Sequence, residues 1–569
     1  MSTMVDKLDV ARALREIGAL LRCKGESSFK VQAYENGSAA VEAISEDLGR
    51  LVEEGRLTQV PGIGVSLASV ITEFVRTGQS ELHVKLRAEL PPGVLELCEI
   101  PGLSPKKVQA LHDALGITSV EELRQACLAG RVRSVKGFGL KTQQSLLEAI
   151  AQREIREARV LLVDALGVAE PLLDHLRAFP EVKQADLAGD VRRFCETVSD
   201  VHVVVASDEA GVVLDHAERF PRVTRVRCRD AQRVDLCLAG DVPASVHVVA
   251  PAHYAGALLM RTGSAAHLAE LGRVATEQGL ALDEARALVR IESDAQIYRA
   301  LGLHPVPPEL REGDGEIEAA RQDDFADLVT QGDIQGMVHC HTVFSDGNDT
   351  IEDMARAAEA MGMKYLTITD HSPTAHYARG VELDRLKLQW DEIARVQERV
   401  KIKLLRGTES DILATGALDY PDAILEQLDV VIASVHSRMK MDEAAMTQRL
   451  VEAMRQPIFK IWGHPLGRLL LRREPFACRV EEVLDVIASS RAAIEVNGDP
   501  YRLDMEPRWL KEARKRGIRF VISTDAHSTK GLSSLRFGVG VARRGGLRKS
   551  EVLNALGPEG FAAAVRPIH

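Results

Sequence analysis

The sequence predicts a multidomain protein whose N-terminal third is α-helical and whose C-terminal third alternates parallel strands with helices. Glycine-containing turns recur between amphipathic helical patterns in residues 60–139. Short apolar runs, each followed by a histidine or an acid, recur from residue 336 onward and are typical of buried strands. The 569 residues leave room for about three or four domains. No apolar run approaches the roughly 18 residues that span a membrane, so no membrane partner is expected.

The turns of the N-terminal third read VPGIG at 60–64, IPGLS at 100–104 and, as a looser copy, VKGFG at 135–139. In a helix-hairpin-helix, such glycines permit a tight turn whose backbone N–H groups point outward at a helix N-terminus. This arrangement suits one DNA phosphate and reads no base sequence. A single copy would be weak evidence, because any helix–helix turn can use these residues. Three copies favour DNA binding, and the residues expected to carry it are Gly62, Gly64, Gly102, Gly137 and Gly139.

In the C-terminal third, metal-ligating residue types follow the apolar runs. Parallel strands alternating with helices can close into a barrel, which carries its chemistry at the C-terminal rim. A single buried histidine is usually a hydrogen-bonded core residue, but here the pattern recurs on at least six strand ends. A structural zinc site would typically include closely spaced cysteines, and the chain has no Cys-x-x-Cys pair. The pattern therefore favours a multinuclear catalytic metal site. Its residues are His339, His341, Asp370, His371, Glu409, His436, His464, Asp525 and His527.

These motifs, in order across 334–569, resemble the polymerase and histidinol phosphatase (PHP) family. The motifs are HCHT with SDG, TDHS, GTES, ASVHS, GHPLGRLLLRR and STDAHS. The resemblance implies a distorted barrel of seven strand–helix units that holds three divalent ions. One ion would take His339, His341, Glu409 and Asp525, a second Glu409, His436 and His464, and a third Asp346, His371 and His527.

The chemistry expected of this site is hydrolysis of a phosphate ester. Neighbouring divalent ions lower the pKa of bound water and clamp phosphate oxygens. Arginines after His464, namely Arg468, Arg472 and Arg473, could hold flanking phosphates, with an ordinary solvated helix face as the equal alternative. Mixed imidazole and carboxylate ligands accept manganese, zinc or iron. The residues assigned catalytic roles are Glu409, Asp525, His341 and Arg468.

Between these regions, the chain resembles X-family DNA polymerases. Residues 25–44 are similar to their N-terminal domain, LAGDVRRFCETVSDVHVVVAS to their palm, and LMRTGSAAHLAELGRVATEQGL to their thumb. Residues 302–320 resemble the joint between this polymerase and a PHP domain, so the chain is identified as a member of the bacterial X-family polymerases with a C-terminal PHP exonuclease. The expected domains are a lyase-like helix-hairpin-helix domain at 1–90, a fingers-like one at 91–150, an α/β palm at 151–245, a thumb at 246–315, a linker at 316–333 and the PHP barrel at 334–569.

The palm departs from the family pattern at its metal site. The family's Asp-x-Asp pair, whose alternate residues share a strand face, reads Asp200-Val201-His202 here, and Asp235 keeps the third position. Because magnesium strongly prefers oxygen ligands, a neutral imidazole at position 202 should badly weaken magnesium binding in the palm.

Further departures affect the nucleotide and lyase sites. The family's Gly-Ser becomes Gly189-Asp190, whose carboxylate would repel a triphosphate, although Arg193 remains. The thumb's aromatic pair becomes Met260-Arg261. The lyase lysines fall at Ser66 and Val70, which cannot form a Schiff base, and only Lys24 or Lys30 could substitute.

The sequence thus predicts a monomeric, cytoplasmic DNA-repair nuclease on a decayed polymerase scaffold. Its expected partner is gapped, nicked or 3'-ended DNA, and abasic-site cleavage is an open extension. The alternatives are a gap-filling polymerase with proofreading that uses manganese, a PHP phosphatase of small molecules, and a noncatalytic DNA-binding scaffold. Eight cysteines without paired spacing indicate reduced thiols. The net charge of −11 argues only weakly against nucleic-acid binding, because a local basic groove suffices.

Overall fold

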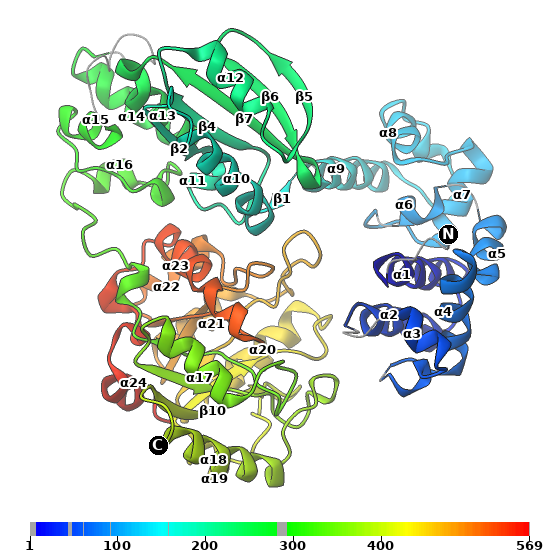
Figure 1. Cartoon of the computed structure of the whole chain (residues 1–569). Helices are drawn as coiled ribbons and strands as arrows, with labels where there is room; N and C mark the ends of the chain where they lie inside the picture. The colour runs from blue at the N-terminus through cyan, green and yellow to red at the C-terminus, as the bar shows by residue number, and fades with distance from the viewer. Residues whose placement is uncertain are drawn as a thin grey trace. The chain divides into compact units, whose positions relative to one another are not determined.

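The structure, a computed structural model, forms two compact units, residues 1–158 and 159–569 (Figure 1). The first unit's expected end at residue 150 falls inside helix α9 (Leu140–Glu157), so the boundary lies at the end of that helix. Pro61 and Ile44, which belong to two of the sequence motifs, lie outside the described residues. The structure describes residues 7–43, 48–60, 62–90, 93–98, 100–157, 159–280 and 293–567.

The N-terminal unit is entirely helical over its described residues. In its first helix, Val10, Leu14, Ile17 and Leu21 are buried at the spacing of one helical face. That helix packs along the second, side by side with it in Figure 1. The helices are α1 (Lys7–Cys23), α2 (Ser28–Ala43), α3 (Leu48–Glu53), α4 (Val65–Thr77), α5 (Glu81–Glu89), α6 (Val94–Cys98), α7 (Pro105–Leu115), α8 (Val120–Leu128) and α9.

The second unit begins with the predicted α/β palm. Its main sheet has the order β2-β4-β7-β6-β5, in which β4 and β7 are parallel and the other neighbours antiparallel. The expected boundary at residue 245 lies within β7, so this strand still belongs to the palm. The palm elements are β1 (Val160–Leu161), α10 (Leu162–Arg177), β2 (Gln184–Ala188), α11 (Gly189–Arg192), β3 (Thr197–Val198), β4 (Val201–Ala206), α12 (Ala210–Glu218), β5 (Val223–Arg229), β6 (Arg233–Leu238) and β7 (Val242–Val249).

The thumb follows, and the expected linker after it is packed rather than free. Glu316, in the segment expected to link the domains, is buried and lies 2.6 Å from Nδ1 of His267 in the thumb. The same carboxylate accepts hydrogen bonds from the backbone N–H groups of Gly313 and Asp314, both 2.7 Å long. The helices are α13 (Tyr254–Thr262), α14 (Ala265–Glu277), α15 (Asp294–Ala300) and α16 (Glu316–Ala319).

The C-terminal part is the predicted seven-stranded parallel barrel. Its strand order is β14-β13-β12-β11-β10-β9-β8, the sequence order in reverse. The two edge strands meet beyond their ends, where Cys340 and Ala526 form a parallel bridge and the His341 N–H donates to the Ala526 carbonyl over 2.8 Å. The strands are β8 (Gly336–Met337), β9 (Tyr365–Ile368), β10 (Lys403–Asp411), β11 (Val430–Ser434), β12 (Lys460–Trp462), β13 (Ala492–Asn497) and β14 (Phe520–Ser523).

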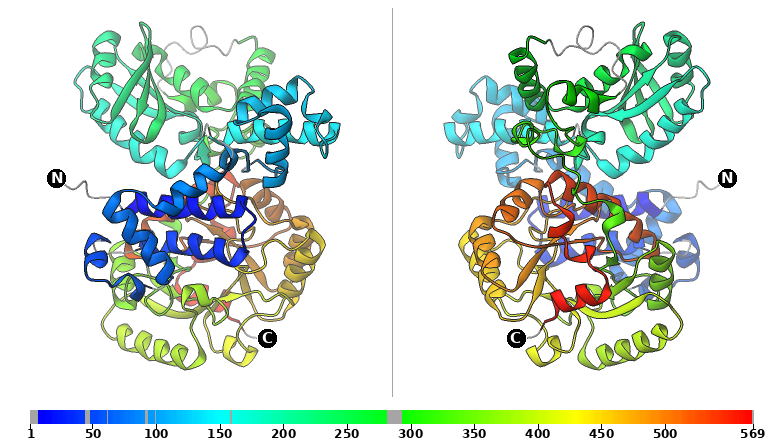
Figure 2. Two further views of the ribbon diagram at one scale, coloured as in Figure 1. Left: turned by 90° about the vertical axis from the view of Figure 1, so that its right-hand side faces the viewer. Right: turned by 90° about the vertical axis from the view of Figure 1, so that its left-hand side faces the viewer.

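Helices surround this barrel on the outside, as both views of Figure 2 show. Inside, alternate strand residues such as Leu405, Ile432 and Ile461 form one apolar cluster, and Phe561 packs into it from the last helix. Glu409 shares the inward face of β10 with Leu405 because side chains alternate along a strand. The helices are α17 (Ile351–Ala360), α18 (Leu383–Gln397), α19 (Asp422–Leu425), α20 (Glu443–Arg455), α21 (Val480–Ala488), α22 (Pro507–Lys515), α23 (Leu535–Arg544) and α24 (Pro558–Val565).

All eight cysteines are free thiols in the described residues, in agreement with the sequence prediction. In that same part of the chain, no helix has the length and apolar character needed to cross a membrane.

Candidate metal centre and DNA-binding turns

The C-terminal strand ends of the barrel bring the first predicted ligand set together. His339 and His341 follow β8, Glu409 lies near the end of β10, and Asp525 follows β14. Nε2 of His339 is 3.4 Å from oxygens of both Glu409 and Asp525. Nε2 of His341 is 3.6 Å and 3.3 Å from the same two groups. Four side chains from three strands therefore face one point, at distances that leave room for an ion between them.

The second predicted set shares Glu409 with the first. Its Oε1 lies 2.8 Å from Nε2 of His464 and 3.2 Å from Nε2 of His436. The two Nε2 atoms are 3.2 Å apart. Two imidazoles and a carboxylate thus meet through these atoms, all of which belong to residue types that bind divalent metals. The other oxygen, Oε2, faces the first set, so Glu409 lies between the two predicted sets.

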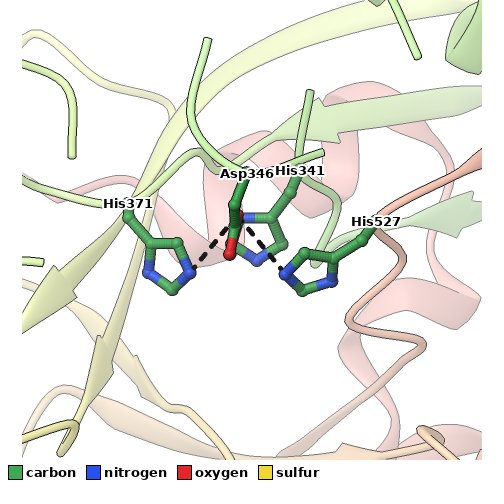
Figure 3. Close-up of side chains that lie close together, drawn as sticks. All are labelled: His341, Asp346, His371 and His527. Carbon is green, nitrogen blue, oxygen red and sulfur yellow. Dashed lines mark ion pairs between the residues drawn. The ribbon is translucent and has the colours of Figure 1, made fainter. Parts of the chain in front are cut away.

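The third predicted set centres on Asp346. Its Oδ1 lies 3.7 Å from Nε2 of His371 and 3.4 Å from Nε2 of His527. Figure 3 shows this carboxylate between the two imidazoles, with His341 beside it. Nδ1 of His341 is 3.8 Å from Asp346, so this ring lies between the first and third sets. His371 also approaches Glu409, with Nδ1 2.9 Å from Oε2. The three sets form one continuous cluster.

Residues that sequence reasoning missed hold the ligands in place. Glu495, buried on β13, lies 2.6 Å from Nδ1 of His339 and also accepts hydrogen bonds from the Ser523 hydroxyl and the His464 backbone N–H. Asp411 pairs with Nδ1 of His436. Such partners fix the tautomer of a ligand histidine and direct its other nitrogen at the metal. The available signal was an acid inside the apolar run AAIEVN, the one barrel strand without a predicted ligand.

Asp370, which also follows a barrel strand, has a different role. It accepts hydrogen bonds of 2.7 Å from both the backbone N–H and the hydroxyl of Thr342, and one of 2.6 Å from Gln389. Its oxygens are therefore used within the protein, where they hold the loop that carries His341.

The cluster fits divalent ions by its unpartnered buried atoms and by the charge states of His341 and Glu409. Several buried nitrogens and one carboxylate oxygen have no hydrogen-bond partner, namely His339 Nε2, both nitrogens of His341, His371 Nδ1, His464 Nδ1 and Glu409 Oε2. Burial and the neighbouring His527 and His371 lower the pKa of His341 to about 3, so its ring is neutral. Burial alone would raise the pKa of Glu409, but the surrounding histidines hold it well below its usual range. Neutral imidazole and ionised carboxylate are the forms that bind metals.

The structure corrects the role expected for Arg468. Its side chain is 6% exposed and bonds to Glu196 of the palm over 2.7 Å and to the carbonyl of Arg502 over 3.0 Å. Because the N–H groups of this guanidinium already donate to protein oxygens, they are not available to bind a phosphate. Arg502 lies at the centre instead, with Nε 3.5 Å from Asp525 and 3.6 Å from Asp499.

In the palm, the predicted metal residues also lie close together, but they are occupied. His202 on β4 and Asp235 on β6 both face Ser245 on the strand between them. Asp235 accepts from Arg233 and from the Ser245 hydroxyl, each over 2.7 Å. His202 lies 2.9 Å from Asp200 through Nε2 and 3.2 Å from the His247 ring through Nδ1.

The expected nucleotide site of the palm is closed by ion pairs as well. Gly189, at φ +62°, starts α11, and a Cβ there would lie 2.9 Å from the His202 ring. Asp190 pairs with Arg159 at 3.0 Å and with Arg193 at 2.5 Å. Arg193 also reaches Glu312, at 3.1 Å. The arginine and the acid that the sequence places here therefore neutralise each other.

The remaining degenerate positions lie on helices. Met260 and Arg261 are in the last turn of α13. Ser66 and Val70 are on α4, and neither has a titratable side chain. Lys24 pairs with Glu89 at 2.5 Å, and Lys30 lies 3.5 Å from Glu26.

The three glycine turns of the N-terminal unit share one geometry. Gly62, Gly102 and Gly137 have φ of +89°, +90° and +92°, a region that favours glycine. Each is exposed and is followed by a buried apolar residue and then by the start of α4, α7 or α9. The looser third copy is thus structurally equivalent to the other two.

The backbone conformation at the other two predicted glycines does not require glycine. Gly64 and Gly139 lie outside the left-handed region and have open space around them. Ser104 occupies the corresponding place in the second turn, where its hydroxyl caps α7 by accepting from Lys107 N. Basic residues follow the second and third turns but not the first, which continues with Val65 and Ser66.

Comparison with known proteins covers nearly the whole chain. Residues 338–499 match the PHP domain family, 6–80 a helix-hairpin-helix domain, 94–152 a SAM-like helix-hairpin-helix tandem and 257–312 the DNA polymerase beta thumb. The DNA polymerase/3'-5' exonuclease PolX of Bacillus subtilis is 33% identical over 96% of this chain and 97% of its own length. Probable phosphatases of Thermoanaerobacter sp. and Vibrio parahaemolyticus are each 28% identical over 38% of this chain and 88% and 87% of theirs.

Proposed function

This chain belongs to the family of the bacterial DNA polymerase/3'-5' exonuclease PolX, and on this premise we propose that it is a DNA-repair nuclease that hydrolyses phosphodiesters in its PHP domain. One observation carries the proposal. Seven of the nine predicted ligands fall into groups that could hold a metal ion, and five of the nine have a buried nitrogen or oxygen without a hydrogen-bond partner. We propose a 3'-5' exonuclease, with abasic-site cleavage as an extension of the same chemistry.

PHP domains are metal-dependent, and the donor set here fits that requirement. We propose three ions of manganese, zinc or iron, because imidazole and carboxylate together suit these metals. Bound divalent ions would supply Lewis acidity and a water of lowered pKa for attack on phosphorus. Glu409 would join two of the three positions, and His341 would contribute to the first while facing the third.

The protein's own groups set the tautomers on which this depends. Glu495 lies beside Nδ1 of His339 and Asp411 beside Nδ1 of His436, so each carboxylate would accept the Nδ1 proton of a neutral ring and leave Nε2 to face Glu409 when an ion is bound. Nδ1 of His527 donates to the carbonyl of Asp525 over 2.8 Å, which turns its Nε2 toward Asp346. Arg502 supplies a positive charge beside Asp525 that would orient a phosphate oxygen.

DNA would be held mainly through its phosphates. The repeated turns present backbone N–H groups at the N-termini of α4, α7 and α9, and Lys107 and Lys141 add charge near the second and third. Contacts of this kind carry no base specificity and weaken as salt rises.

We further propose that templated synthesis by the palm is lost or weak. Asp200, Asp235 and Asp190 each have a cationic or histidine partner, so magnesium and a triphosphate would have to displace existing contacts. The survival of Asp200, Asp235 and Arg193 keeps a gap-filling polymerase as the second candidate. A small-molecule phosphatase agrees with the phosphatase relatives, but they match only part of this chain and leave the turns unexplained.

The test is a gapped duplex whose primer carries a 5' label, incubated with manganese in the presence or absence of deoxynucleoside triphosphates. The proposal predicts stepwise shortening of the primer under both conditions, abolished by a chelator. Extension with nucleotides would favour the polymerase. An unchanged primer together with rapid hydrolysis of a small phosphate monoester would favour the phosphatase.

A further inference from the structure

An exposed aromatic ring lies directly beside the buried metal cluster. Tyr377, in the loop after β9, is 68% exposed. Its ring centre lies 6.0 Å from that of His371 and 6.1 Å from that of His436, and it meets both edge-on. The two histidines belong to different predicted ligand sets, so Tyr377 lies over the middle of the cluster. A tyrosine that leaves most of its surface in water, next to a site of buried polar groups, has no packing reason to be there.

A second exposed tyrosine lies on the loop after β13. Tyr501 is 47% exposed, and the guanidinium of Arg472 lies 5.9 Å above its ring. Its own backbone is fixed, because its N–H donates to Asp499 over 2.9 Å and its carbonyl accepts from Leu470 over 2.8 Å. Tyr501 directly precedes Arg502, which contacts Asp525 of the cluster, so this ring is also tied to the rim of the site.

Positive charge accompanies the two rings. Arg473 donates Nε to the carbonyl of Gly467 over 2.9 Å, and among the described residues it forms no ion pair with a carboxylate. Partial burial and the charge of Arg502 both lower the pKa of Arg473. Arg473 and Arg502, the latter also beside Asp525 and Asp499, are the guanidinium groups of this rim that are available to contact a phosphate.

We propose that this rim binds the unpaired 3'-terminal nucleotides of single-stranded DNA. Tyr377 stacks on the terminal base, Tyr501 with Arg472 stacks on the next base, and Arg473 and Arg502 hold the phosphates. Stacking on aromatic rings tolerates every base because each has a π face, which suits an enzyme that removes nucleotides in succession. A terminal pair of a duplex would have to open before its strand could enter, at a cost in stacking and pairing.

The inference rests on the proposed nuclease function and assigns Tyr377 and Tyr501 as the residues that would bind the bases at the 3' end. A phosphatase of small sugar or amino-alcohol phosphates would gain nothing from two separated stacking surfaces. The aromatic rim therefore also discriminates between the two functions that the cluster could serve.

The experiment compares two single-stranded oligonucleotides that differ only in whether the 3'-terminal nucleotide carries a base. Each has a phosphorothioate at the last linkage to resist hydrolysis, and binding to the full chain is followed by fluorescence anisotropy in manganese. The glycine turns should bind both oligonucleotides with the same affinity. The ratio of the two Kd values therefore reports only the contribution of the terminal base to binding. The variants are Tyr377→Ala and Tyr377→Phe, with Leu388→Ala, a 60% exposed leucine on α18, as the control.

We expect the parent, Leu388→Ala and Tyr377→Phe to bind the base-bearing end about tenfold more tightly than the abasic end, and Tyr377→Ala to lose this preference. A preference unchanged in Tyr377→Ala, or equal weakening on both strands, would overturn the inference. Hydrolysis of the unprotected strands is measured in parallel. Absence of cleavage with a Tyr377-dependent preference would count against the nuclease function alone, and normal cleavage without that preference against the rim alone.

Discussion

The barrel and the palm each gather histidines and acids, but only the barrel leaves their lone pairs unused. In the barrel, Glu409 approaches five histidines and retains an oxygen without a hydrogen-bond partner. In the palm, Asp235 is held by Arg233 and Ser245, and Asp190 lies between two arginines. The presence of acids therefore does not distinguish a metal site. A metal site is distinguished by acids that have no cation or hydrogen-bond donor from the protein itself.

The two regions also differ in how their ligands are supported. In the barrel, Glu495 contacts Nδ1 of His339 and Asp411 contacts Nδ1 of His436. These contacts orient the two rings so that their Nε2 atoms face the cluster. In the palm, His202 uses both ring nitrogens on protein partners, Asp200 and His247. Burial and nearby cations, Arg261 first, lower the pKa of His247 to about 3, so that ring adds no charge that could attract phosphate.

The largest expected effect comes from removing the bridge of the barrel cluster. Glu409→Ala should reduce hydrolysis of a 3' end by at least about a hundredfold, because it disturbs two ion positions at once. The matched change in the palm, Asp235→Ala, should leave the rate within about twofold. The measurement is the initial rate of primer shortening in manganese, with circular dichroism to verify folding. Equal rates for a folded Glu409→Ala and the parent would refute the assignment.

A substitution at a residue that supports a predicted ligand tests the same difference between the barrel and the palm. Glu495→Gln keeps the shape of the side chain but removes the charge that holds the Nδ1 proton of His339. We expect metal affinity or activity to fall about 10-fold to 100-fold, as is usual for such supporting groups. Glu316→Gln, another buried acid paired with a histidine but located outside the barrel, is the control. Titration of activity with manganese reports both, and a Glu495→Gln curve that overlays the parent would show that this support is dispensable.

Restoring the palm tests the other side of the comparison. His202→Asp with Asp190→Ser returns a hard oxygen ligand and removes the carboxylate from the expected triphosphate site. We expect extension of a primer in magnesium to rise at least about a hundredfold above a nearly undetectable parent, since each reversed change is worth roughly 1.4 kcal/mol or more of transition-state stabilisation. Extension is measured in a Glu409→Ala background. Efficient extension by the unrestored palm would contradict its loss of function, and an inactive double variant would direct attention to Met260 and Arg261.

The smallest effect is expected at the turns. Gly137→Val forces a β-branched residue to φ near +92° and should weaken DNA binding about fivefold, equally for unrelated sequences. Binding should also depend less steeply on salt, with a slope reduced by about one. Gly139→Ser, which copies the position of Ser104, is the control and should bind like the parent. A loss confined to one DNA sequence would show base readout instead.

The sequence predicted the barrel and the gathering of its ligands because parallel strands carry their end residues to one rim. Eight of the nine positions lie at or just after a recognisable apolar run, whereas Asp346 was expected only from the family resemblance of its SDG motif. The three turns, including the looser third copy, were also predictable from the sequence. A backbone φ near +90° favours glycine, so each turn is marked by a glycine.

Contacts between distant segments were beyond this reasoning. Arg468 follows a ligand motif, but it bonds to Glu196, 272 positions away in the palm, and so cannot reach a phosphate. Glu495 was missed because the sequence around a single acid in an apolar strand does not show which residue that acid contacts. The packing of the expected linker at 316–333 was likewise not predictable, because Glu316 within it contacts His267, which lies 49 positions earlier in the thumb.

The most direct test of the contrast between the two sites is one gel. A 5'-labelled primer in a gapped duplex is incubated with manganese and all four deoxynucleoside triphosphates, using the parent and Glu409→Ala. If the barrel carries the chemistry and the palm is closed, the parent shortens the primer and Glu409→Ala leaves its length unchanged. A primer that grows longer in Glu409→Ala, once the nuclease no longer conceals synthesis, would contradict the account.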